Sequence, residues 1–128
     1  MLYYIQLLAI QATRGKEKMI NRTQIVKGIL EGCVLKVIGE GKCYSGELAD
    51  RLKERGFSDV STGTLFPLLL RLEKEELVDA ERVPNELGPM RKYYRLTEKG
   101  QRELELFSRT WEEMKAVVDG ILQKEDGK

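Results

Sequence analysis

The spacing of apolar residues changes twice along this chain, and that change constrains the fold more than any other feature. Three segments before residue 77 and one after residue 97 carry apolar residues three and four positions apart, which is helical spacing. Between them, residues 77–83 and 91–96 read as strands on either side of the loop 84–90, which contains two prolines and a glycine. The chain is therefore predicted to be mainly α, with one small two-stranded β wing.

The first two helical segments differ in how much of their surface is apolar. Residues 22–39 are apolar on nearly all sides, which predicts a helix buried by its own domain and by a second subunit. Residues 44–56 predict a helix with one apolar face, with Ser45 as its N-cap and Gly56 as its C-terminal stop.

The third helical segment, residues 61–76, has leucines at spacings of three and four. Ser61 or Thr62 is expected to cap it. Pro67 is expected to be tolerated because amides near a helix start need no helical partner. A helix, a short turn and a second helix with an apolar inner face form the helix-turn-helix pattern.

The last helix is the most regular element of the sequence. It is expected to start at Thr97 as N-cap, and large apolar residues then recur at alternating spacings of three and four. They are Leu104, Phe107, Trp111, Met114, Val118 and Ile121. Such a seam is typical of helices that pair along their length, so residues 97–123 are predicted to be a dimerisation helix. The first helix of the partner is expected to share this surface.

This order of elements predicts a winged helix-turn-helix with a C-terminal dimerisation helix. Three blocks within residues 22–122, namely YSGELADRL, VSTGTLFPLLLRLEKEELV and GPMRKYYRLTEKG, resemble the PadR family of transcriptional regulators, in its short subfamily with one C-terminal helix. The resemblance implies a sequence-specific DNA-binding regulator, mostly a repressor, and some members respond to small aromatic compounds. Gly46, Phe66 and Glu76 depart from the aromatic, the tyrosine and the glycine that the family often has there, so no tyrosine hydroxyl contact is expected at residue 66.

We expect four parts in the chain. They are an N-terminal extension at 1–21, a winged helix-turn-helix DNA-binding domain at 22–96, the dimerisation helix at 97–123 and a tail at 124–128. Residues 1–18 come either from a start codon upstream of Met19 or from an extra docking helix. Their run of about eight apolar residues is too short to span a bilayer and lacks the features of a signal peptide, so we expect a cytoplasmic protein with no membrane partner.

Charge is distributed unevenly along the sequence. The whole chain carries only +1, which gives no sign of nucleic acid binding. Residues 89–102, however, hold five cations against one acid, a net +4, and residues 103–128 are net −3. Arg91, Lys92 and Arg95 of the wing are therefore predicted to neutralise DNA phosphates, with Arg91 able to enter a narrow minor groove. The alternative is a solvated strand face.

The start of the third helix is predicted to point into the major groove, as recognition helices do. Ser61, Thr62 and Thr64 are the expected contacts there, and simple helix capping is the alternative for each. Tyr44 resembles the family's tyrosine at the start of the second helix, where it lies close to the DNA backbone, with buried packing as the alternative. Tyr94 is expected to face the core.

Trp111 suggests a place for a small aromatic ligand. A two-fold axis would bring it near its own copy, and two indoles can sandwich a flat molecule. Phe107 and Met114 flank it one turn away, and in similar multidrug-sensing family members a tryptophan on this helix has this role. The alternative is a packed core tryptophan.

Several classes of function are not expected. The chain has no histidine, which removes the common zinc spacings and His-dependent triads, and it has no glycine-rich phosphate loop. We therefore expect no enzyme, no metal and no cofactor.

Cys33 and Cys43 are interpreted as buried free thiols, with a redox switch as the alternative. The expected partners are double-stranded DNA with an inverted-repeat operator and a second copy of the chain. The rival interpretation is a winged-helix module that binds protein instead of DNA.

Overall fold

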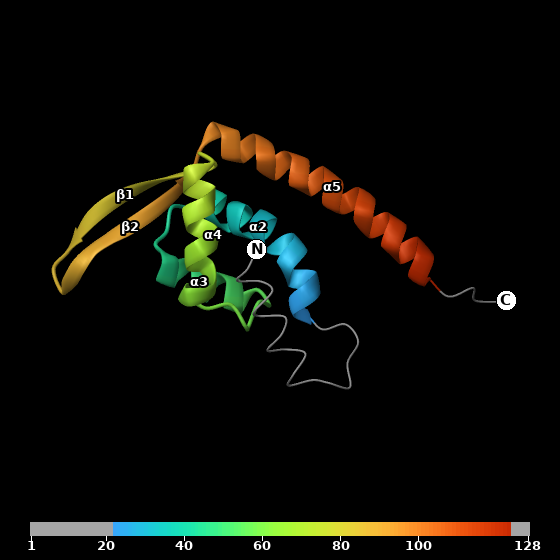
Figure 1. The fold of residues 1–128 in the computed structure, drawn as a ribbon, viewed down its shortest axis with the longest axis horizontal. Coiled ribbons are helices and arrows are strands. Elements are labelled where there is room, and N and C mark those ends of the chain that lie inside the picture. The colour runs from blue at the N-terminus through green and yellow to red at the C-terminus, as the bar shows by residue number, and fades with distance from the viewer. Residues whose placement is uncertain (1–21, 124–128) are drawn as a thin grey trace.

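A computed structural model describes residues 22–123, so the predicted extension at 1–21 and the tail at 124–128 lie outside the described residues. The elements are α2 (Arg22–Glu40), α3 (Ser45–Glu54), α4 (Thr62–Lys74), β1 (Val78–Asn85), β2 (Gly88–Leu96) and α5 (Glu98–Leu122). Three helices form a body, the hairpin projects from one side of it, and α5 extends away from the other side (Figure 1). The predicted fold class, a winged helix-turn-helix with a C-terminal helix, is confirmed.

The core lies between α2, α3, α4 and the base of the wing. Its largest fully buried side chains come from all three helices, namely Leu30, Leu35, Ile38, Leu48, Leu52, Leu65, Leu69 and Leu72. Tyr94 of β2 closes the core and is 4% exposed, which confirms the prediction that it faces inward. Burial raises the pKa of its phenol. The apolar surface of α2 is only partly used within one chain, because Ile25 remains 60% exposed.

The N-terminus of α3 is built differently from the prediction. Tyr44 is the N-cap and Ser45 is the first helical residue, so the expectation of a Ser45 cap is wrong. The carboxylate of Glu47 reaches back and accepts from the backbone N–H of Tyr44 at 3.3 Å, which is the bond that the acid at the third helical position makes in a capping box. At the other end Gly56 has a φ of 119°, a conformation that favours glycine, and the chain turns there as predicted.

Pro67 lies inside α4, which runs through it without interruption. It is the sixth helical residue, counted from Thr62, so its position would normally bond to the carbonyl of Gly63. The predicted reason for its tolerance is therefore wrong, because only the first four amides of a helix need no partner. The helix therefore lacks one backbone hydrogen bond at Pro67, and the packing of the leucines on its inner face stabilises it.

The wing is longer and tighter than predicted. Its strands reach Asn85 and Gly88, which leaves two residues between them in place of the seven-residue loop expected at 84–90. Pro84 lies in an irregularity of the ladder between the Val83–Arg91 and Asn85–Gly88 pairs. In a two-stranded sheet both strands are edges, so prolines with outward-facing nitrogens fit without loss of ladder bonds.

A short backbone bridge joins the wing to the body. The N–H of Cys43 donates to the carbonyl of Tyr94 at 3.3 Å, and the N–H of Tyr94 donates to the carbonyl of Cys43 at 2.8 Å. Cys43 is fully buried and Cys33 is half-buried, and both are free thiols. Burial raises the pKa of both, which keeps them protonated near neutral pH and favours the interpretation as small apolar residues over the redox switch.

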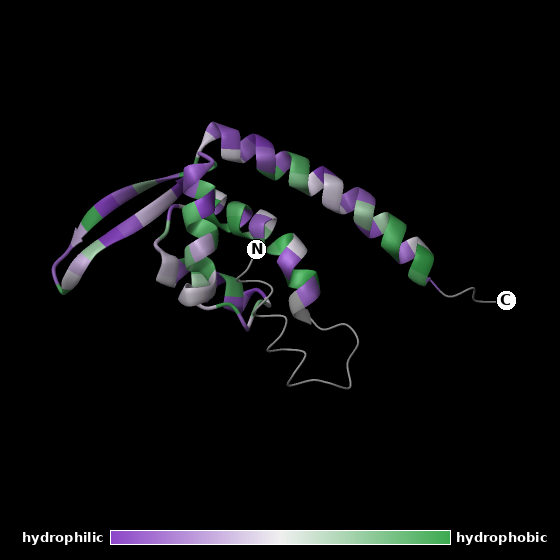
Figure 2. Ribbon diagram, in the orientation of Figure 1, coloured by the Kyte–Doolittle hydropathy of each residue, from purple (hydrophilic) through white to green (hydrophobic). Residues whose placement is uncertain are grey.

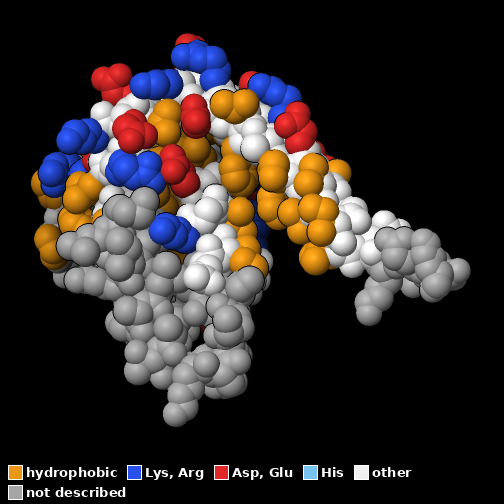
Figure 3. Space-filling view, turned by 45° about the vertical axis from the view of Figure 1, so that its right-hand side comes forward, with side chains coloured by type: hydrophobic (Ala, Val, Ile, Leu, Met, Phe, Trp, Pro, Cys, Tyr) orange, Lys and Arg blue, Asp and Glu red, His pale blue; other side chains and the backbone are white. Residues whose placement is uncertain are grey.

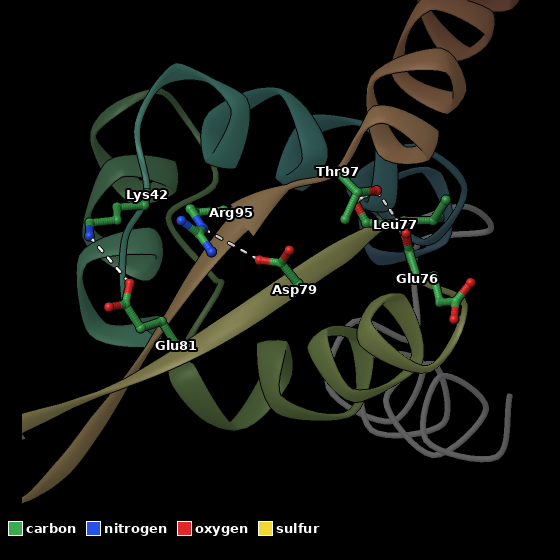
Figure 4. A network of polar contacts seen from close by, with 7 residues as sticks. All are labelled: Lys42, Glu76, Leu77, Asp79, Glu81, Arg95 and Thr97. Carbon is green, nitrogen blue, oxygen red and sulfur yellow. Dashed lines mark hydrogen bonds and ion pairs between the residues drawn. The ribbon is translucent and has the colours of Figure 1, made fainter.

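A compact joint connects α4, the wing and α5. Thr97 is the N-cap of α5, as predicted, and its Oγ1 accepts from the N–H of Gly100 at 2.9 Å. The same hydroxyl donates to the carbonyl of Glu76 at 2.7 Å, with the carbonyl of Leu77 3.0 Å away (Figure 4). Glu76 has a φ of 66°, the left-handed conformation that explains why glycine would suit this position.

The first half of α5 packs on α2 and the second half leaves the body. Leu104 is buried, and the ring of Phe107 occupies the space that the absent side chain of Gly32 leaves open. Further along, apolar side chains face solvent in the single chain, and Figure 3 shows such side chains gathered on the arm and on the body beside it. Among the described residues, no helix combines the length and the apolar character needed to span a bilayer.

Candidate nucleic-acid interface

The N-terminus of α4 is capped and exposed. Ser61 is the N-cap, and its Oγ accepts from the N–H of Thr64 at 3.2 Å, with the Thr64 hydroxyl also 3.2 Å away. The capping alternative therefore holds for Ser61. Thr64 is half-buried, whereas Thr62 is exposed at the first helical position. The unpaired amides of this end carry partial positive charge, which attracts anions such as phosphate.

One side of the wing forms an aromatic cluster with the start of α3. The guanidinium carbon of Arg91 lies 4.3 Å from the centre of the Tyr44 ring. The rings of Tyr44 and Tyr93 meet edge to face, with centres 5.5 Å apart and planes at 73°. Lys42 reaches the other end of the cluster, 6.0 Å from the centre of the Tyr93 ring. Tyr44 is thus half-buried under Arg91. Its environment is intermediate between the two predicted alternatives, which were a place close to the DNA backbone and buried packing.

The position of Tyr44 depends on a glycine. A Cβ added to Gly46 would lie 2.8 Å from Cε2 of the Tyr44 ring, closer than real side chains allow. An aromatic residue at this position, as the family often has, would displace the ring. Gly46 therefore helps to position the Tyr44 ring of the site. The sequence analysis identified Gly46 only as a departure from the family pattern and did not predict this role.

Lys92 and Arg95 have acidic partners that the count of wing charges did not include. Nζ of Lys92 lies 2.9 Å from Glu73 of α4. Figure 4 shows the second pair, in which Nε of Arg95 lies 3.4 Å from Asp79 of β1. Lys42 similarly pairs with Glu81 at 3.5 Å (Figure 4). All these pairs are at least partly exposed, so each contributes at most about 1 kcal/mol and can be exchanged for a phosphate.

Arg91 differs from the other predicted wing contacts. Within residues 22–123 no carboxylate forms an ion pair with it, and its charge rests on the face of Tyr44. A guanidinium held on an aromatic face keeps its N–H donors available at the ring edge. The structure thus separates the predicted cations into one unneutralised arginine and two that are already paired.

The predicted effector residues are spread along α5. Phe107 lines a pocket of about 340 Å³ between α2 and α5, together with Cys33, Lys36 and Leu104. Trp111 and Met114 lie outside this pocket and are 41% and 49% exposed. A single chain therefore does not bring the three residues around one cavity, and an effector site between two copies of Trp111 stays a prediction.

Comparisons with known proteins agree with this architecture. The family model described as the transcriptional regulator PadR-like family matches residues 34–106. The crystal structure of a PadR-like transcriptional regulator from Bacillus cereus is 43% identical with a TM-score of 0.72, and the match covers 80% of this chain and 99% of that one. A PadR family transcriptional regulator from Eggerthella lenta is 25% identical with a TM-score of 0.73, covering 98% of this chain and 100% of that one.

A further relative, "Uncharacterized protein X" from Lysinibacillus sphaericus, is 31% identical over 104 residues, which are 80% of this chain and 95% of the relative. The family model alone spans more than half of the sequence and includes α3, α4, the whole wing and the first turns of α5. The chain belongs to the PadR-like family of transcriptional regulators.

Proposed function

We propose that the protein is a DNA-binding transcriptional regulator that acts as a homodimeric repressor on an inverted-repeat operator. One observation carries the proposal. The exposed N-terminus of α4 lies in a body to which the wing is tied through Lys92 and Glu73, and the wing carries Arg91 without an acidic partner among the described residues. In this arrangement α4 enters the major groove and Arg91 reaches the flanking backbone or minor groove.

The exposed arm supports the homodimer. Met114, Val118 and Ile121 are 49%, 45% and 76% exposed on one side of α5, as the seam pattern predicted. A monomeric soluble protein rarely leaves such a row of apolar side chains uncovered. A second copy covers this row and places two recognition helices about 34 Å apart, or a multiple of that distance, which is one turn of DNA.

The direct test is binding of the full chain to the DNA upstream of its own gene, since such regulators often control themselves or a neighbour. Affinity is measured over a range of salt concentrations, because neutralised phosphates give log K a linear dependence on log salt. A protein-binding winged helix, the rival function, would show neither affinity for the duplex nor this dependence. A reporter gene behind the bound site then distinguishes repression from activation.

Replacing Arg91 by alanine is expected to weaken binding to all duplexes alike and to lower the salt slope by about 1. Lys92→Ala is expected to lower it less, because Glu73 already neutralises that ammonium. Arg109→Ala, an exposed arginine on α5, serves as the matched control with an unchanged slope. An unchanged slope in a folded Arg91→Ala dimer would remove the wing from the interface.

The proposal includes release by a small aromatic effector held between two copies of Trp111. This is the only tryptophan in the chain, so its fluorescence reports on that one place. Titration with planar aromatic dyes or phenolic acids is expected to quench the emission in a saturable way and to weaken DNA binding. Emission that stays constant across such a panel, with no access for small quenchers, would show a packed tryptophan and no effector site there.

A further inference from the structure

The outward face of α4 is unusual for an exposed helix. Its first three turns present the α4 strip, defined as Thr62, Gly63, Phe66, Pro67 and Leu70, all of them exposed and none of them charged. Phe66 is 59% exposed and Leu70 is 45% exposed. Helix surfaces that face only water are normally polar or charged. Figure 2 shows the same lack of strongly hydrophilic residues along α4 up to its C-terminal end.

The surroundings of the α4 strip indicate what covers it. The strip begins at a helix N-terminus, with its partial positive charge, and continues toward the exposed Lys74. Arg71 lies between them and pairs with Glu31 and Glu75. No carboxylate lies within it. An apolar surface that starts at a positively charged helix end matches the major groove of DNA, where phosphates line both edges and the thymine C5-methyl is an apolar group on the floor.

We propose that Phe66 reads the C5-methyl group of a thymine in the major groove, with Leu70 contacting a neighbouring methyl or sugar. The inference rests on the proposed function and deepens it by naming what the recognition helix selects. A phenyl ring neither donates nor accepts a conventional hydrogen bond, so it discriminates bases through apolar contact, and thymine offers that contact. Gly63, one turn earlier, adds no side chain that would hold the helix away from the bases.

The geometry of the helix limits which thymines can be read. Phe66 and Leu70 are four residues apart, which separates them by about 6 Å along the axis. This is close to two base-pair steps of about 3.4 Å. Each half-site is therefore expected to hold one thymine that depends on Phe66, with any position that depends on Leu70 within two base pairs of it.

Phe66 can be changed without harm to the fold. The core is held by Leu65, Leu68 and Leu69, which are at most 3% exposed, whereas Phe66 points to solvent. Phe66→Ala is therefore expected to keep the helical content and the stability of the parent. Phe66→Leu keeps an apolar side chain and tests whether contact, and not the ring itself, is required.

The experiment uses a duplex selected from a random-sequence library with the full chain. Each thymine of the selected duplex is then replaced by deoxyuridine, which pairs in the same way but lacks the C5-methyl. Symmetric replacement in both half-sites is expected to weaken the parent about 16-fold at the Phe66 position, since each of the two lost methyl contacts is worth about fourfold. In Phe66→Ala this penalty is expected to disappear, and in Phe66→Leu it is expected to persist.

Leu87→Ala is the matched control, because Leu87 is an exposed leucine at the tip of the wing, 96% accessible, and away from α4. Whatever it does to overall affinity, the pattern of deoxyuridine penalties is expected to stay the same. A selected duplex that shows no deoxyuridine penalty, or a penalty that survives in Phe66→Ala, would overturn the inference and leave DNA binding intact. Failure to select any duplex would overturn the proposed function and the inference with it.

Discussion

Replacing Met114 and Val118 together by glutamate is expected to turn the proposed dimer into monomers and to abolish specific DNA binding. Both side chains are half-exposed on the free arm in the single chain, so the variant should fold normally. In a dimer, four carboxylates would be pressed into an apolar seam, where an unpaired charge costs several kcal/mol. A monomer reads one half-site only, and losing the linked second contact lowers affinity by a factor of about 10² to 10⁴.

The matched control for this prediction is Ala116→Glu with Gly120→Glu. These residues each lie two positions beyond Met114 and Val118, which is about 200° around the helix. They introduce the same number of glutamates on the opposite side of the arm, and we expect a dimer that still binds. Sedimentation at micromolar concentration measures the state of association, and a monomeric parent protein would contradict the proposed dimer directly.

Replacing Gly100 by valine is expected to destabilise the fold by about 3 kcal/mol. Gly100 is buried in the first turn of α5, and an added Cβ would overlap the backbone carbonyl of Leu77 as well as the side chain of Leu96. Backbone atoms cannot turn aside as a flexible side chain can, so either α5 or the start of β1 must move. The hydrogen bonds of Thr97 to both segments would then be weakened together.

Urea unfolding at a fixed protein concentration measures this loss, because dimer stability depends on concentration. Gly120→Val on the same helix is the control. A Cβ there meets nothing within 4 Å, so we expect a change within about 0.5 kcal/mol. Equal stability of the Gly100 and Gly120 variants would mean that the joint is looser than its contacts indicate.

The sequence predicted those features that depend on local spacing. The core position of Tyr94 followed from the alternation of β2. The cap Thr97, and Ser61 as one of two candidates with Thr62, followed from short polar residues ahead of apolar periodic segments. These features need only neighbours within a few residues. The same holds for the exposed apolar row of α5, whose spacing alone defines one face.

The paired charges of the wing could not be predicted in the same way. Arg95 meets Asp79 because the two residues are partners in the strand register, and Lys92 meets Glu73 across the junction with α4. Register depends on the turn, and the turn was predicted as seven residues where the structure has two. Residues 89–102 do carry a net charge of +4. Part of that charge is neutralised, because two of its cations pair with acids that lie outside this segment. The stacking of Arg91 on Tyr44 likewise joins residues far apart in sequence.

Because α5 is attached to the body near Thr97, a small rotation there produces a large displacement at the far end of the helix. Its 25 residues correspond to an arm of about 37 Å, which is held to the body at one end by the Thr97 hydrogen bonds, by the bond from Lys99 to the carbonyl of Glu75 and by the packing of its first half. A rotation of about 10° at this pivot displaces the far end by about 6 Å, close to two base-pair steps of DNA. Relatives that share the same recognition helix but differ at the pivot would thus read the same half-site at different separations. If the protein binds its operator as the proposed dimer, operator spacing and operator sequence can evolve independently.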